Sequence, residues 1–69
     1  MAKLKINGAE RDFTAGLPQT LAGLLEQLGI EAATVVAEID GRIVEQKDFI
    51  SAKLSAGQTI ELVRFVPGG

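Results

Sequence analysis

Two dipeptides, Asn7-Gly8 and Asp40-Gly41, constrain the fold of this chain more than any other feature of its sequence. The central residues of a two-residue hairpin turn need a positive φ, which asparagine, aspartate and glycine adopt most readily. Residues 3–7 alternate polar and apolar side chains up to the first dipeptide, and residues 35–39 are rich in β-branched side chains up to the second. The sequence therefore predicts two β-hairpins.

A helix is predicted between the two hairpins. Thr20 is a suitable N-cap residue, and Gly29 stands where a left-handed residue commonly ends a helix, with Ile30 placed to seal that end. Gly23 inside the helix costs about 1 kcal/mol relative to alanine, so we expect it to let the helix lie close against a strand. Four leucines recur at the spacing of one helix face, namely Leu21, Leu24, Leu25 and Leu28.

The remaining elements complete a fold of two layers. Return strands are expected at residues 9–14 and 42–44, a short helical turn over the sheet edge within residues 45–54, and a last strand at residues 59–66. The order hairpin, helix, hairpin, strand is typical of an α+β domain with one helix on one face of a mixed sheet of about five strands. Because the first and last strands can pair at the sheet centre, we expect the β-grasp (ubiquitin-like) arrangement.

The last predicted strand has two distinct faces. Side chains alternate between the faces of a sheet, so Ile60 and Leu62 are predicted to face the core. Val63 and Phe65 then point outwards, close to the end of the strand. An outward apolar pair is typical of a partner-docking surface, although isolated exposed apolar side chains also occur without a role. We interpret Val63 and Phe65 as candidate docking residues.

Composition excludes several classes of function. The chain of 69 residues has no Cys, His, Trp or Tyr, which removes thiolate and imidazole catalysis and every zinc site built on nitrogen or sulfur. We therefore predict no catalytic residues, no metal site and no enzyme. A net charge of −2 with scattered cations argues against nucleic acid as a partner. No apolar run approaches the roughly 20 residues of a membrane span, and no secretory leader is expected.

The end of the sequence offers the strongest functional signal. We divide the chain into a domain at residues 1–66 and a flexible tail at residues 67–69. Pro67 cannot continue a central strand, and Gly68 and Gly69 have no side chain. A carboxylate on such a tail can enter a narrow channel that excludes any residue with a Cβ. A glycine-rich end without a role is the alternative, but departure from a central strand of a β-grasp domain favours a functional tail.

The whole chain resembles the small ubiquitin-like sulfur carriers of the ThiS/MoaD family, and most closely the ThiS-type carriers of thiamin biosynthesis. The length and the Gly-Gly end are more selective than the hydrophobic spacing, which many β-grasp domains share. The resemblance is carried by Asn7-Gly8, Gln19-Thr20, residues 24–28, residues 35–44, residues 56–58, residues 60–64 and Gly68-Gly69.

The resemblance implies a mechanism for the tail. In that family an E1-like, ThiF-type adenylating enzyme uses ATP and Mg²⁺ to adenylate the C-terminal glycine, which then becomes a thiocarboxylate. The thiocarboxylate donates sulfur to a ThiG-type thiazole synthase. By resemblance Gly69 carries the sulfur, and Gly68 and Pro67 form the narrow tail. The other implied partner is a sulfur donor such as a cysteine desulfurase. The carrier would bind no cofactor itself and would work in the cytoplasm.

Other functions remain open at this stage. The nearest alternative is the small subunit of molybdopterin synthase, whose members tend to be longer, followed by a thiocarboxylate carrier of another sulfur pathway. From a different class, the chain could be a ubiquitin-fold interaction module or a protein modifier joined to lysines. Removal of Gly69 would abolish a carrier or a modifier and leave an interaction module intact.

Overall fold

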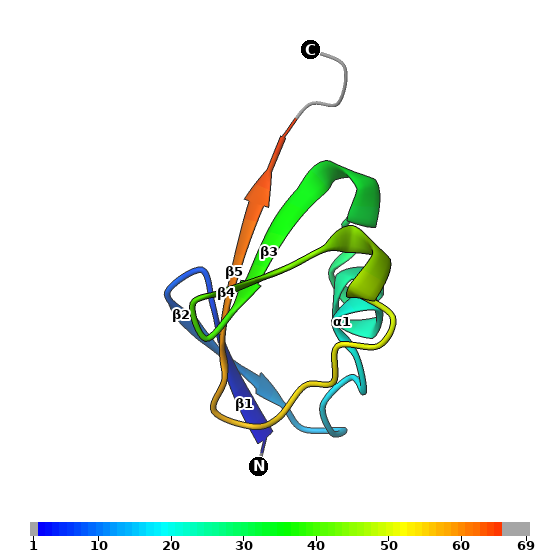
Figure 1. Ribbon diagram of the computed structural model, residues 1–69. Helices are drawn as coiled ribbons and strands as arrows, with labels where there is room; N and C mark the ends of the chain where they lie inside the picture. Colours follow the sequence, from blue (N-terminus) through cyan, green and yellow to red (C-terminus); the bar gives the residue numbers. More distant parts are fainter. Residues whose placement is uncertain (1, 66–69) are drawn as a thin grey trace.

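In residues 2–65, which the computed structural model describes, five strands form one mixed sheet with the order β2-β1-β5-β3-β4 (Figure 1). The first and last strands, β1 (Ala2–Ile6) and β5 (Thr59–Arg64), pair in parallel at the centre of the sheet. The other three strands pair antiparallel with their neighbours, and these are β2 (Ala9–Phe13), β3 (Val35–Ile39) and β4 (Arg42–Val44). The predicted α+β architecture is confirmed.

Both hairpins turn at the predicted dipeptides. Asn7 and Gly8 have φ values of 49° and 84°, and Asp40 and Gly41 have φ values of 50° and 83°. These paired positive values are the ones that a two-residue turn between antiparallel strands requires. The strands on either side begin and end within one residue of the predicted positions.

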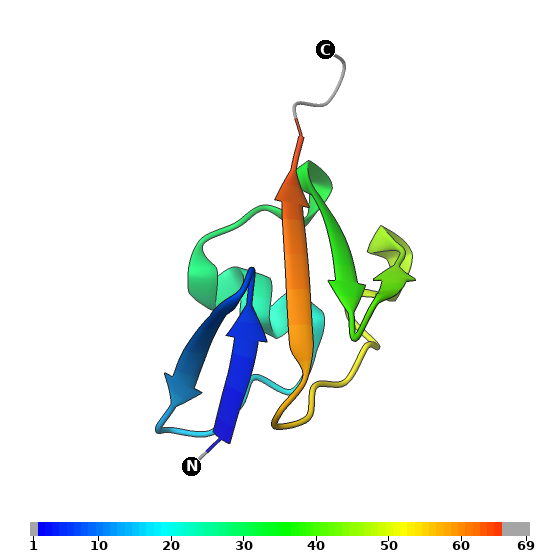
Figure 2. The ribbon, with the colours of Figure 1, turned by 90° about the vertical axis from the view of Figure 1, so that its left-hand side faces the viewer.

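Helix α1 (Leu21–Leu28) covers one face of the sheet, and within residues 2–65 the other face carries no helix (Figure 2). Thr20 Oγ1 accepts a hydrogen bond from the backbone N–H of Gly23 at 3.2 Å, which confirms the N-cap. Gly29 has a φ of 71° and donates its N–H to the carbonyl of Glu26, which ends the helix as predicted.

The core lies between α1 and the sheet. No polar or charged side chain is buried among the described residues, so this core depends on apolar packing alone. Ile60 and Leu62 of β5 face inwards as predicted, and so does Phe13 of β2. The buried side chains are Leu4, Phe13, Leu21, Leu24, Leu25, Val35, Ala37, Phe49, Ile60 and Leu62.

The expectation for Gly23 is wrong. A Cβ at this position would lie 3.5 Å from Cβ of Pro18 and 3.6 Å from Oγ1 of Thr20, and no strand atom is among these neighbours. Gly23 therefore faces the segment that leads into α1. Its lack of a side chain does not set the distance between helix and sheet.

The helical turn expected after β4 is the 3₁₀ helix η2 (Gln46–Asp48), and the segment that follows it packs against the start of α1. Phe49 is buried in the core. The carbonyls of Phe49 and Ala52 accept hydrogen bonds from the backbone N–H groups of Ala22 and Leu21, each at 2.9 Å. The first N–H groups of a helix have no partner within it, so this segment satisfies donors that α1 cannot.

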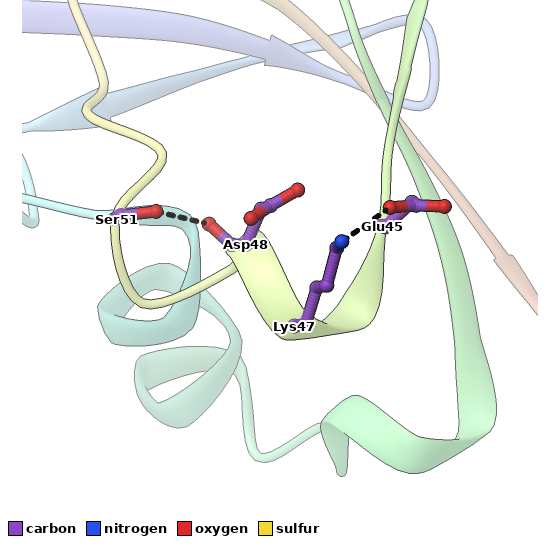
Figure 3. A network of polar contacts seen from close by, with 4 residues as sticks. All are labelled: Glu45, Lys47, Asp48 and Ser51. Carbon is purple, nitrogen blue, oxygen red and sulfur yellow. Dashed lines mark hydrogen bonds and ion pairs between the residues drawn. The ribbon is translucent and has the colours of Figure 1, made fainter.

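Polar contacts on the surface of the same segment are shown in Figure 3. Lys47 Nζ lies 3.5 Å from Glu45 Oε2, and Ser51 Oγ donates to the carbonyl of Asp48 at 3.2 Å. Both charged side chains of the ion pair are largely exposed, and such pairs contribute at most about 1 kcal/mol. Phe49 and the backbone bonds to α1 therefore hold the segment in place.

The last strand is shorter than predicted. β5 ends at Arg64, whereas the prediction placed its end at Val66, which lies outside the described residues. Phe65 keeps one further bond, from its N–H to the carbonyl of Thr34 at 2.8 Å. Thr34 belongs to the 3₁₀ helix η1 (Ala32–Thr34), which lies between α1 and β3. The ladder ends here because its partner strand begins only at Val35.

Candidate functional site

The predicted site residues fall into two groups. Pro67, Gly68 and Gly69 lie outside the described residues, so the structure gives no geometry for them. Val63 and Phe65 are described, and they are 61% and 46% exposed. Val63 points away from the core on the uncovered face of the sheet, as the alternation predicted. The structure confirms their exposure, while their role in docking stays a prediction.

Strand pairing extends this exposed pair into a larger surface. Val63 lies opposite Val36 of β3, which is also exposed. Glu61 lies opposite Glu38 of β3, and Glu38 lies opposite the exposed Ile43 of β4. Residues directly opposite in an antiparallel pair share a face of the sheet. We refer to this surface as the outer patch, and it consists of Val36, Glu38, Ile43, Glu61, Val63 and Phe65.

Asn7 braces β5 from the side of β1. Its Oδ1 accepts the N–H of Leu62 at 2.7 Å, and its Nδ2 donates to the carbonyl of Leu62 at 3.2 Å. The backbone N–H of Asn7 donates to the carbonyl of Ile60 at 2.9 Å. The side-chain amide thus provides a donor and an acceptor as a peptide group of the next β1 residue would. It extends the ladder past the end of β1, toward the outer patch.

Asp40 braces β5 from the other side, nearer to the start of the strand. Its Oδ1 accepts the N–H of Thr59 at 2.9 Å, and its backbone N–H donates to the carbonyl of Thr59 at 2.8 Å. Each hairpin therefore uses its first turn residue to hold the central strand that leads to the tail. The dipeptides predict the turns but not these bonds. One feature of the sequence could have indicated these bonds. Glycine alone can form such a turn, so an asparagine or aspartate at its first position is a candidate for a side-chain bond to nearby backbone groups.

Among residues 2–65 no three side chains of His, Cys, Asp or Glu gather closely enough to hold a metal ion. Within the same range no helix is long and apolar enough to cross a membrane. The exposed apolar side chains and their cross-strand neighbours make the outer patch on β5, β3 and β4 the candidate site.

The mixed sheet with the C-terminal strand at its centre and one helix on one face defines a β-grasp domain of the ubiquitin-like class. Residues 4–69 match the ThiS family. This chain belongs to the ThiS family, the sulfur carriers of thiamine biosynthesis, which are carrier proteins rather than enzymes. Membership of this family favours the thiamine branch over the molybdopterin alternative.

Solved structures agree with this assignment. The crystal structure of the thiamine biosynthesis protein ThiS from Geobacter metallireducens has a TM-score of 0.83 and 25% identity, and covers 97% of this chain and 99% of that chain. A solution NMR structure of a thiamine biosynthesis protein from the same organism has a TM-score of 0.78 and 25% identity, with coverage of 97% and 87%.

A longer relative is also similar in sequence. A thiazole synthase from Paramagnetospirillum magneticum is 36% identical over 67 residues, which is 97% of this chain. This chain spans only 20% of the length of that relative.

Proposed function

We propose that this protein carries sulfur as a thiocarboxylate on Gly69 and delivers it for thiazole formation in thiamine biosynthesis. The observation that carries this proposal is the family match, which runs through the last two glycines to residue 69. The protein acts as a co-substrate, with no catalytic residue, bound cofactor or metal of its own. We place its reactions in the cytoplasm.

The proposed chemistry has two steps. A carboxylate oxygen of Gly69 attacks the α-phosphorus of ATP, which gives an acyl-adenylate and pyrophosphate. In the second step the terminal sulfur of a persulfide, carried by a donor such as a cysteine desulfurase, attacks the carbonyl carbon, expels AMP and forms an acyl disulfide. A thiol then attacks the donor-side sulfur of this acyl disulfide, which releases the thiocarboxylate and leaves a disulfide on the donor. Activation is needed because a carboxylate is a poor electrophile. An E1-like, ThiF-type enzyme supplies the positioning, with Mg²⁺ to neutralise the phosphate charge.

In this proposal the outer patch and the tail belong to one recognition unit. The exposed Val63 and Phe65 stand at the end of β5 and bind the activating enzyme. Pro67 and Gly68 then pass through a channel that admits no bulky side chain. The hydrogen bonds of Asn7 and Asp40 to β5 support this proposal. They fix the position of the strand that carries the docking residues and leads to the tail.

A thiazole synthase of the ThiG type is the proposed acceptor of the sulfur. The similarity to a protein named thiazole synthase supports this choice. Because this chain spans a small part of that relative, we propose that it meets the synthase as a partner domain or as a separate protein.

The adenylation step is tested by ATP–pyrophosphate isotope exchange with the adenylating enzyme of the same organism. The wild-type protein is expected to support exchange, and deletion of Gly69 is expected to abolish it. A protein that carries a C-terminal amide on Gly69 serves as the matched control, because it keeps every residue and removes only the reactive oxygen. Exchange supported equally by the amide, or none with the wild type, would contradict the proposal.

A further inference from the structure

Two carboxylates face each other in the middle of the outer patch. Glu38 of β3 and Glu61 of β5 are directly opposite in the antiparallel ladder. Because their chain neighbours Ala37 and Leu62 are buried in the core, alternation places both carboxylates on the face that α1 does not cover. Like charges directly opposite on a sheet destabilise it. The fold thus accepts an unfavourable pair in the middle of β5, the strand that leads to the tail.

Within the described residues no cation stands directly opposite either carboxylate or forms an ion pair with it. The ion pair of Glu45 with Lys47 is the one found in residues 2–65, and it lies elsewhere, beside η2. Lys5 is the basic residue of β1 nearest in register, yet it stands opposite Thr59, two residues before Glu61. It makes no ion pair with Glu38 or Glu61 within 4.0 Å.

Apolar side chains border the two carboxylates. Ile43 lies beside Glu38 across the β3–β4 ladder, and Val36 and Val63 form the next cross-strand pair along β3 and β5. Ile43 is 69% exposed and Val36 is 44% exposed. Lysine and arginine combine an apolar stem with a charged head, so these surroundings offer contacts to both parts of such a side chain.

We propose that the outer patch binds a protein partner through a basic side chain, most favourably an arginine, whose charged head lies between Glu38 and Glu61 while its stem contacts Val63. A guanidinium presents several N–H donors in a planar fork and can bond to two carboxylates at once. The charge of the patch selects this occupant. The proposal rests on the proposed function, since β5 would bring the same partner to the tail.

Charge also argues against the other occupants of an exposed sheet face. A second copy of this chain, docked patch to patch, would bring its own Glu38 and Glu61 toward the first pair, and like charges across an interface are costly. Nucleic acid and anionic lipid are repelled for the same reason. A basic protein surface can interact favourably both with the two carboxylates and with the apolar side chains that border them.

The test measures binding of the double variant Glu38→Gln with Glu61→Gln to the adenylating and thiazole synthase enzymes of the same organism, by titration calorimetry at low and high salt. A matched control, Glu26→Gln with Asp48→Asn, changes the net charge equally at exposed positions of α1 and η2. For at least one enzyme we expect the patch variant to lose affinity by about tenfold or more and to lose salt dependence. The control should stay within about twofold of the wild type.

Unfolding would not explain this loss, because removal of a like-charge pair should leave the thermal midpoint of the patch variant at or above that of the wild type. Equal binding of the patch variant and the wild type by both enzymes would overturn the inference. So would a loss of equal size in the control, or a wild type that binds neither enzyme. The proposed function is judged separately, by the chemical state of Gly69, so each can fail without the other.

Discussion

The uncovered face of the sheet has two halves that differ in how their charges are arranged. In the half formed by β1 and β2, opposite charges face each other, because Lys3 lies opposite Asp12 and Lys5 lies opposite Glu10. In the half formed by β3, β4 and β5, Glu38 faces Glu61 among exposed apolar side chains. The two halves belong to the same sheet.

The difference distinguishes side-chain pairs that stabilise the sheet from a surface that we propose binds a partner. Complementary pairs across strands stabilise a sheet modestly, even where, as here, no ion pair closes within 4.0 Å. The β1–β2 half is thus complementary within itself. The outer patch leaves apolar and acidic groups without such complements among residues 2–65, and a protein partner would supply them. The contrast predicts that changes in the two halves affect stability and binding in different ways.

The largest contrast is expected between the two faces of β5. Ile60→Ala should lower the free energy of unfolding by about 2–5 kcal/mol, because Ile60 is fully buried in the core. A domain of this size has a net stability of only roughly 3–5 kcal/mol, so this variant should be largely unfolded. Val63→Ala should change stability by about 0.5 kcal/mol or less. Urea denaturation followed by circular dichroism measures both, and equal losses would contradict an outer patch that folding does not need.

The second largest contrast in stability is expected between substitutions of Asn7 and Asp40, the two residues whose side chains bond to β5. Asn7→Gly keeps the positive φ of the turn but leaves the N–H and the carbonyl of Leu62 without partners in a partly buried place. We expect a loss of about 1–3 kcal/mol. Asp40→Gly removes one bond, to the N–H of Thr59 at an exposed site, where water can replace it, so its loss should be smaller. Denaturation midpoints of the two variants measure this difference. A larger loss for Asp40→Gly than for Asn7→Gly would show that the bonds of the Asn7 side chain to Leu62 contribute little to stability.

Gly23→Ala tests the helix side and leaves both halves of the outer face unchanged. The added methyl group would meet Pro18 and Thr20 at ordinary contact distances, so the helix should gain roughly 0.5–1 kcal/mol from the better propensity of alanine. Partner affinity should not change. A lower thermal midpoint would mean that the start of α1 tolerates no side chain at this position.

The smallest effects should have opposite signs in the two halves. Lys5→Gln removes an attraction to Glu10, and Glu61→Gln removes a repulsion from Glu38. The first should lower stability and the second should raise it, each by roughly 0.2–1 kcal/mol at low salt. Thermal unfolding at low and high ionic strength checks both, since salt should reduce each effect. Shifts of the same sign would contradict the contrast between the halves.

Local sequence signals predicted most of the fold. The hairpins at Asn7 and Asp40, the cap at Thr20 and the end of α1 at Gly29 follow from backbone preferences of single residues and their neighbours. The faces of β5 follow from alternation, which correctly placed Val63 in solvent.

Features that depend on pairing between distant segments could not be predicted in this way. Glu38 faces Glu61 only in the register that core packing sets between β3 and β5. The bond of Asn7 to Leu62 joins residues 55 positions apart. Gly23 was misinterpreted because its neighbours in space, Pro18 and Thr20, precede it in the chain instead of lying on a strand.

The most direct test of the carrier function is the intact mass of the protein isolated from cells that contain its sulfur-transfer enzymes. We expect a fraction that ends at Gly69 and is heavier by the difference between one sulfur and one oxygen, with the added mass on the C-terminal fragment. Deletion of Gly69 should remove this fraction. A terminus that stays a plain carboxylate when the adenylating enzyme, ATP and a sulfur donor are all supplied, or a chain that continues beyond Gly69 in the cell, would contradict the proposed carrier function.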